Sequence, residues 1–154
     1  MNIDILKVNS EEMALEANKY LTKLIHDEKK YDENINEECV VKSLYDNFYI
    51  NDGVCILLAK FEEQYVGYLF GTMMDIGDAY IKPQAKLDAM FVDEEYRENK
   101  IGKKLIDAFK LWAKQKGAKY IELTVCNGND SAINLYKNNG FKDTKITMQY
   151  IVEE

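Results

Sequence analysis

The segment from residue 85 to residue 125 constrains the fold most, because it predicts a strand, an amphipathic helix and a second strand in direct succession. The strands are AKLDAMFV at 85–92 and KYIELTV at 119–125, and Gly117 follows the helix as a C′ glycine. The apolar stripe of the helix consists of Ile101, Leu105, Ala108, Phe109 and Trp112. Such a unit predicts two parallel strands joined by a right-handed crossover.

The other predicted strands have antiparallel neighbours. Residues 3–8 alternate apolar and polar side chains, as a half-buried strand does. Residues 54–61 and 64–74 are predicted to form a hairpin through Glu62 and Glu63. The segment 141–152 is predicted to supply one or two final strands.

Three further helices are predicted. The first follows the N-cap residue Ser10 and runs to about Asp27, the second covers about 36–48, and the third covers 130–139. The order β-α-α-β-β-β-α-β-α-β predicts a mixed α/β (α+β) fold, with helices on both faces of a mostly antiparallel sheet. We expect a single domain over residues 1–154, because a chain of this length buries one core.

The composition argues against several classes of function. A net charge of -7 disfavours nucleic acid as a partner, because binding phosphates needs a basic face. With one histidine, His26, and no Cys-x-x-Cys, neither a His-rich zinc site nor a histidine triad is expected, and we expect no metal. The longest apolar run, 54–59, is too short to cross a membrane. The three cysteines are an odd number and no signal sequence is visible, so a reduced, cytoplasmic compartment is expected.

Two motifs point to one family. The first, at the strand-to-helix turn, reads Arg97-Glu98-Asn99-Lys100-Ile101-Gly102, and the second combines Asn129, Ala132, Leu135, Tyr136, Gly140 and Phe141. Together they resemble the GNAT superfamily of acetyl-CoA-dependent N-acetyltransferases, whose signatures are Arg/Gln-x-x-Gly-x-Gly/Ala and Asn-x-x-Ala-x-x-Leu-Tyr…Gly-Phe. The predicted order of elements matches this family over almost the whole chain. The resemblance implies a GNAT-type fold with the parallel pair of strands splayed at the cofactor site.

The resemblance implies that the turn before the long helix binds the pyrophosphate of coenzyme A. The first N–H groups of a helix lack acceptors within it, and the helix dipole favours an anion there. The binding groups are predicted to be mainly main-chain amides, and the side chains of Arg97 and Lys103 could add positive charge. The predicted set is Arg97, Glu98, Asn99, Lys100, Ile101, Gly102 and Lys103. The alternative is that these polar residues only solvate the end of the helix.

Lys100 departs from the family pattern, because it stands where the first motif glycine is expected. If this position requires a positive φ, lysine costs on the order of 1 kcal/mol. If it requires the absence of a side chain, the pyrophosphate is displaced. We therefore expect weaker or shifted binding of the cofactor, although a lysine could also add charge toward a phosphate.

The remaining cofactor contacts are implied by the same resemblance. The backbone of Met90, Phe91 and Val92 is expected to pair with the pantetheine amides, and an amide near Met90 or Phe91 could polarise the thioester carbonyl. The side chains of these residues are expected in the core. Asn129 matches a family asparagine that binds the cofactor, and it could also cap the following helix.

Two residues are predicted to transfer protons. The resemblance places the hydroxyl of Tyr136 near the coenzyme A sulfur, where a phenol that stays protonated at neutral pH can act as general acid. Its alternative is a core tyrosine. Asp88, on the strand that leads to the turn, is the nearest candidate for the general base, although strand alternation could equally turn it to solvent.

The acceptor is predicted to be a primary amine, from a small molecule or a peptide. The segments expected to shape its pocket are rich in acidic and aromatic residues, which would suit a cation. These residues are Asp27, Glu28, Tyr31, Asp32, Glu33, Glu37, Glu38, Tyr45, Tyr49, Asp75, Asp78 and Tyr80. The alternatives are that the loops of an acidic protein carry such residues everywhere, and that the domain binds acyl-CoA without catalysis. The final strand could pair across a homodimer.

Overall fold

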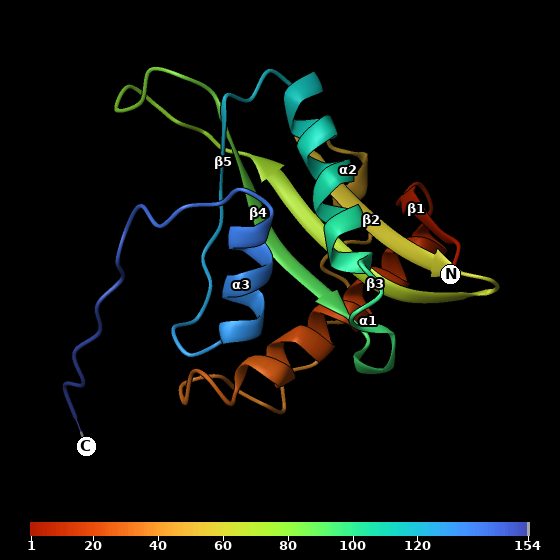
Figure 1. Cartoon of the computed structure of the whole chain (residues 1–154), viewed down its shortest axis with the longest axis horizontal. Helices are drawn as coiled ribbons and strands as arrows, with labels where there is room; N and C mark the ends of the chain where they lie inside the picture. Colours follow the sequence, from red (N-terminus) through yellow and green to blue (C-terminus); the bar gives the residue numbers. More distant parts are fainter. Residues whose placement is uncertain (154) are drawn as a thin grey trace.

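Five strands form one sheet in the order β1-β2-β3-β4-β5 in the computed structural model, which describes residues 1–153 (Figure 1). The strands are β1 (Ile3–Lys7), β2 (Val54–Phe61), β3 (Gln64–Met73), β4 (Gln84–Val92) and β5 (Tyr120–Glu122). The first four pair antiparallel, whereas β4 and β5 are parallel. The predicted mixed sheet with one parallel pair is confirmed.

Three α-helices and two short 3₁₀ helices complete the fold. They are α1 (Glu11–Glu28), η1 (Phe48–Ile50), η2 (Glu94–Tyr96), α2 (Ile101–Gln115) and α3 (Asp130–Asn138). Ser10 caps α1 as predicted, because its side chain accepts a hydrogen bond of 3.2 Å from the amide of Met13. In the described part of the chain, no helix is long and apolar enough to cross a membrane.

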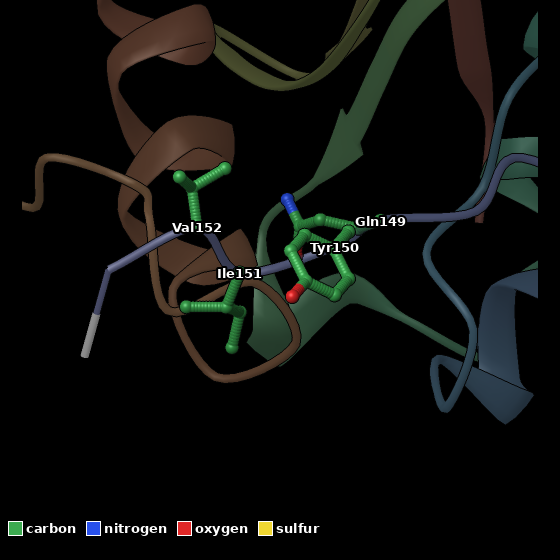
Figure 2. Close-up of a pocket in the computed structure, with 4 residues that line it drawn as sticks. All are labelled: Gln149, Tyr150, Ile151 and Val152. Carbon is green, nitrogen blue, oxygen red and sulfur yellow. The ribbon is translucent and has the colours of Figure 1, made fainter.

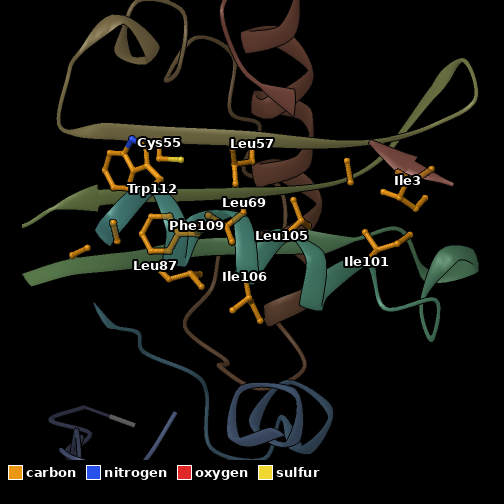
Figure 3. Close-up of a cluster of buried hydrophobic side chains, with 14 residues drawn as sticks. Ile3, Cys55, Leu57, Leu69, Leu87, Ile101, Leu105, Ile106, Phe109 and Trp112 are labelled. Atoms are coloured by element: carbon orange, nitrogen blue, oxygen red, sulfur yellow. The ribbon is translucent and has the colours of Figure 1, made fainter. Parts of the chain in front are cut away.

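The two longer helices cover opposite faces of the sheet. The stripe of α2 packs on side chains such as Leu57, Leu69 and Leu87, and Figure 3 shows this cluster between helix and strands. Residues of α1 such as Ala14 and Tyr20 pack on the other face. The helical period of α2 and the two-residue period of the strands therefore build one core on each side of the sheet.

The predicted helix over 36–48 is wrong, because this segment consists of turns that lead into η1. Its backbone is held by the buried side chain of Asn18 on α1 rather than by helical bonds. The Asn18 amide donates to the carbonyl of Lys42 at 3.2 Å and accepts from the amide of Tyr45 at 3.0 Å. Tyr45 is buried, while Val40 and Leu44 are exposed. These tertiary contacts override the apolar spacing.

The predicted final strands are also wrong, because residues 141–153 form neither a strand nor a helix. A strand needs an edge to pair with, and none of the strands within residues 1–153 pairs with this segment. For the same reason β5 has three residues instead of the seven predicted at 119–125. Its continuation, 123–125, has no ladder partner among the described residues.

Candidate active site

The parallel strands β4 and β5 form a fork. They pair only where Gln84, Ala85 and Lys86 face Tyr120, Ile121 and Glu122. Beyond this point β4 continues to Val92, while the chain after β5 turns away toward α3 (Figure 1). On that side no described strand pairs with residues 87–92. Main-chain groups at the end of β4 are thus open to a ligand that can add as a strand.

The three residues predicted to line this edge are Met90, Phe91 and Val92, and alternation along β4 leaves the main-chain groups of Met90 and Val92 facing it. Their side chains are half-buried and pack against the two cores, as expected. On the other side they are in register with Leu69, Tyr68 and Gly67 of β3, respectively. The strand is therefore held firmly along one edge and open along the other.

The first turn of α2 lies beside the open end of β4. The amide of Lys104 is the first to bond within the helix, to the carbonyl of Lys100 at 3.1 Å. The amides of Ile101, Gly102 and Lys103 therefore have no acceptor inside α2 and point out of its end. Ile101 contributes only backbone, because its side chain is buried in the core. This geometry suits an anion.

The turn before α2 has a left-handed backbone at two residues that are not glycine. Lys100 has φ 62° and ψ 20°, and Glu98 has φ 68°. Each such residue costs about 1–2 kcal/mol. Asn99 braces the turn between them, because its side-chain amide donates to the carbonyls of Tyr96 and Arg97 at 3.0 and 3.2 Å. Position 100 does require a positive φ, so the lysine is strained.

The two basic side chains predicted to add charge at this turn are turned to protein partners. The Nε of Arg97 donates to the carbonyl of Val92 at 2.9 Å, and its guanidinium lies 5.1 Å from the centre of the Phe91 ring. The ammonium of Lys103 lies 2.6 Å from the carboxylate of Asp107, one turn further along α2. Arg97 thus remains at the end of β4, whereas Lys103 is directed away from the turn.

Gly102 brings the two sequence motifs together. A Cβ at this position would lie 3.0 Å from a methyl group of Leu135 on α3 and 3.7 Å from Met90 on β4. A larger residue would require the side chain of Leu135 to shift. Glycine therefore allows α2 to pack closely on α3 and leaves the backbone accessible to a ligand.

Helix α3 carries the other predicted residues. Asn129 caps it, since its side-chain oxygen accepts from the amide of Ala132 at 3.2 Å. Tyr136 is partly buried and meets the ring of Phe141 edge to face, with centroids 5.8 Å apart. Burial, followed by the charge of Glu28, raises the pKa of Tyr136 to about 12. The hydroxyl is therefore protonated at neutral pH and can donate a proton or a hydrogen bond.

Asp88 lies at a β-bulge in β4. Phe70 pairs with Ala89 and Gly71 pairs with Leu87, which leaves Asp88 as the extra residue. Because Leu87 packs on the α2 side and Ala89 on the α1 side, the bulge turns Asp88 toward the α1 side. Its carboxylate accepts a hydrogen bond of 2.9 Å from the hydroxyl of Thr72. Partial desolvation raises the pKa of Asp88, and the hydrogen bond from Thr72 opposes that rise.

Two buried tyrosines adjoin Asp88 on the α1 side. The hydroxyls of Tyr45 and Tyr68 share a hydrogen bond of 3.2 Å. Burial raises the pKa of both phenols, and the negative charge of Asp88 raises them further. Asp88 itself is exposed, which agrees with the alternative that this side chain turns to solvent.

Glu28, the last residue of α1, is a second carboxylate at the fork, and its role was not predicted individually. Burial, then the charges of Asp27 and Asp32, raises its pKa. Its own charge acts on Tyr136, Tyr68 and Cys126. The sequence contains a signal for this position. Glu28 follows Leu21 by seven residues and Leu24 by four, so it lies on the apolar side of α1.

The other acidic residues predicted around the acceptor do not gather at one place. Asp27 pairs with Lys30 at 3.1 Å, and Asp75 accepts from the amide of Gly77 within its own loop. Tyr31 does adjoin the fork, because a Cβ on Gly128, in the loop before α3, would lie 4.0 Å from its ring. Among residues 1–153 no group of three or more His, Cys, Asp or Glu side chains could hold a metal ion.

The site therefore has two sides. The open edge of β4, the free amides of α2 and Tyr136 of α3 can receive an extended anionic ligand. Asp88 and Glu28 belong to the α1 side, where carboxylates can hold or deprotonate a cation. The fork between β4 and β5 connects the two sides.

Comparison with known proteins identifies relatives of this architecture. The sequence model of the acetyltransferase (GNAT) family matches residues 21–141. No curated protein matches the chain by sequence. A tetramutant of the BH1408 protein from Bacillus halodurans is similar in structure, with a TM-score of 0.83 and 18% identity over 97% of this chain and 99% of that one.

Two aminoglycoside acetyltransferases are also similar in structure. AAC(6')-Iy, in complex with the bisubstrate analogue CoA-S-monomethyl-acetylneamine, has a TM-score of 0.73 and 17% identity, covering 99% of each chain. The enzyme meta-AAC0020, from an uncultured soil metagenomic sample and in complex with sisomicin, has a TM-score of 0.73 and 17% identity, covering 98% of this chain and 97% of its own. At these identities the likeness establishes the fold.

Proposed function

Because the chain belongs to the acetyltransferase (GNAT) family, we propose that it transfers the acetyl group of acetyl-CoA to a primary amine while both substrates are bound. The observation that carries this proposal is the fork, whose open strand edge lies beside three helix amides with no acceptor inside α2, while the neighbouring helix α3 carries a protonated tyrosine. Acetyl-CoA supplies the activated thioester.

The residues that would hold acetyl-CoA are those of the α2 and α3 side. The amides of Ile101, Gly102 and Lys103 face the pyrophosphate, and the open edge of β4 pairs with the pantetheine amides. Arg97 adds positive charge at the end of β4. Lys100 is strained but exposed, so its side chain can lie outside the phosphate site while its backbone keeps the turn.

Tyr136 is the proposed general acid. Its raised pKa keeps the proton on the phenol at neutral pH, ready for the sulfur of the departing thiol. The proposed base is a carboxylate of the α1 side, Asp88 or Glu28, both of which have a raised pKa and therefore bind a proton more readily than usual. A carboxylate there would also attract the ammonium form of the acceptor before it is deprotonated.

We propose a small cationic amine as the acceptor. Two carboxylates and Tyr31 adjoin the fork, which favours a cation over a neutral amine. The aminoglycoside acetyltransferases of similar fold, one in complex with sisomicin, agree with this class of acceptor. A peptide amine is the competing class, and a non-catalytic acyl-CoA-binding domain is the competing function.

The test is release of free thiol from acetyl-CoA with a panel of a polyamine, an aminoglycoside and a peptide with a free N-terminus. We expect turnover with a polyamine or the aminoglycoside. Tyr136→Phe should lower kcat about 10²-fold or more, because a positioned general acid contributes about 10²–10⁴-fold. Tyr120→Phe, on the exposed face of β5, is the matched control and should leave kcat unchanged. No turnover with any amine, despite binding of acetyl-CoA, would favour the non-catalytic alternative.

A further inference from the structure

Two surface hollows of the described chain differ in the charge of their lining. One lies at the C-terminal segment and is lined by Gln149, Tyr150, Ile151 and Val152, which carry no charge (Figure 2). The other lies between α1, the hairpin of β2 and β3, and the end of β4. Its lining includes Tyr20 and Lys23 of α1 and also Asp93, the residue that follows β4. This second hollow therefore adjoins the start of the turn that leads into α2.

Both oxygens of the Asp93 carboxylate are held by α1. The hydroxyl of Tyr20 donates to Oδ2 at 2.7 Å, and the ammonium of Lys23 donates to Oδ1 at 2.8 Å. Tyr20 is 3% exposed and the side chain of Asp93 is 13% exposed, so water competes little for these bonds. Lys23 also lies 4.5 Å from the centre of the Tyr20 ring. We call these three residues the Asp93 clamp.

Tyr20 reaches the end of β4 through its ring as well. The ring centre lies 6.4 Å from that of Phe91, and the guanidinium of Arg97 lies 5.1 Å from the same Phe91 ring. Burial, followed by the hydrogen bond to Asp93, raises the pKa of Tyr20, so its hydroxyl remains a donor. Helix α1 thus contacts both the last residues of β4 and the first residue after the strand.

The turn after Asp93 needs such support because its backbone is strained. Glu98 and Lys100 are both left-handed, and residues of this kind persist only where the surrounding structure fixes them. The amide of Asp93 donates to the carbonyl of Val66 at 2.9 Å, and its carbonyl accepts from the amide of Tyr96 at 2.9 Å. Asp93 is therefore the point at which the turn is anchored both to the sheet and to α1.

We propose that the Asp93 clamp positions the acetyl-CoA site, because it fixes the turn that presents the free amides of α2 to the pyrophosphate. This inference rests on the proposed function and gives α1 a part in binding the cofactor. The clamp acts through the turn, so its three members are positioning residues. Its effect falls on binding rather than on proton transfer, because the proposed acid, Tyr136, lies on α3.

The charge of Asp93 separates positioning from electrostatics. Asp93→Asn removes a negative charge beside the turn, so electrostatics alone predicts tighter binding of the anionic acetyl-CoA. Loss of the clamp predicts the opposite, because the side-chain nitrogen of asparagine cannot accept a hydrogen bond and one of the two donors of α1 loses its partner. We expect calorimetric titration of Asp93→Asn to show binding about fivefold to tenfold weaker than in the wild type.

Lys23→Met breaks the clamp at an exposed position, and Lys19→Met is the matched control. Lys19 lies one turn earlier on α1, lines the same hollow and pairs with Glu16 at 3.0 Å, so both variants lose the same charge. Lys23→Met should raise the KM for acetyl-CoA about fivefold to tenfold, with kcat almost unchanged. Lys19→Met should match the wild type. Lys23→Arg keeps a cation beside Asp93 and should restore the wild-type KM.

Hydrogen exchange without ligand tests the clamp apart from the proposed function. The amides of Tyr96, Arg97 and Lys104 bond to carbonyls of residues 93–100, and they should exchange faster in Asp93→Asn and Lys23→Met than in the wild type. Unchanged exchange, unchanged or tighter binding by Asp93→Asn, or an equal rise in KM in Lys19→Met would overturn the clamp alone. A wild-type chain that binds no acetyl-CoA would overturn the proposed function and this role of the clamp with it.

Discussion

Replacement of Lys100 by glycine tests how the turn before α2 works. Lys100 has a left-handed backbone, which costs a residue with a side chain about 1–2 kcal/mol. Glycine adopts this conformation freely but loses about 0.5–1 kcal/mol through the entropy of the unfolded chain. The difference predicts that Lys100→Gly stabilises the protein by about 0.5–1 kcal/mol, which is a rise in Tm of about 2–3 °C for a chain of this size.

Glu62→Gly is the matched control. Glu62 also has a left-handed backbone, with φ 55°, but it lies in the β2–β3 hairpin, away from the fork. Both variants should gain similar stability in urea unfolding, because the backbone strain is the same. Only Lys100→Gly changes the predicted pyrophosphate site, where it should tighten acetyl-CoA binding or leave it almost unchanged.

The measurement is a pair of calorimetric titrations with acetyl-CoA, one for each variant, compared with wild type. A tenfold loss of affinity in Lys100→Gly, about 1.4 kcal/mol, would refute this view of the turn and show that the lysine side chain holds the ligand. Destabilisation of Lys100→Gly with stabilisation of Glu62→Gly would refute the strain argument. Equal affinity with a matched gain in stability is the predicted result.

Three further predictions concern residues of the α1 side. The pKa of Glu28 is raised in the folded protein, so the ionised carboxylate is less favourable there than in the unfolded chain. The resulting loss of folding stability is absent at low pH and grows as pH rises through the folded pKa. Glu28→Gln should therefore stabilise the protein at pH 7 and have little effect near pH 3; the reverse pattern in urea unfolding at the two pH values would contradict this. If Asp88 is the base, Asp88→Asn should remove the rise of kcat/KM with pH that accompanies loss of its proton, and an unaltered profile would exclude it. Asn18→Leu should cost about 2–4 kcal/mol, because it leaves the Lys42 carbonyl and the Tyr45 amide without their partner, and a loss under 1 kcal/mol would show that water replaces the side chain.

The periodic parts of the chain could be predicted from the sequence. The stripe from Ile101 to Trp112 predicted α2 because it keeps helical spacing over more than three turns, and alternation with a polar turn predicted the hairpin through Glu62 and Glu63. The parallel pair of strands was predicted correctly, because a strand, a helix and a strand follow one another directly in the sequence. For Lys100 the sequence left two alternatives, a positive φ or the need for no side chain, and the structure has the positive φ.

The remaining features depend on contacts that sequence spacing does not contain. Residues 36–48 do not form the predicted helix, because hydrogen bonds from Asn18, which is 18 or more residues away in the sequence, hold the backbone in turns. The bulge that turns Asp88 toward α1 arises from the register between β3 and β4. The final strand was predicted from a pattern that is present, but none of the strands within residues 1–153 pairs with it. The effect of Glu28 on Tyr136 depends on how the end of α1 packs near α3, which the spacing of residues in the sequence does not determine.

A calorimetric titration of the wild-type protein with acetyl-CoA, with ATP as the control anion, tests the central claim most directly. The free amides of α2 and the open edge of β4 predict micromolar binding, about -8 kcal/mol, with ATP much weaker because it lacks the pantetheine arm. No binding of acetyl-CoA by the folded protein, or equal binding of ATP, would contradict the claim that the fork is an acetyl-CoA site.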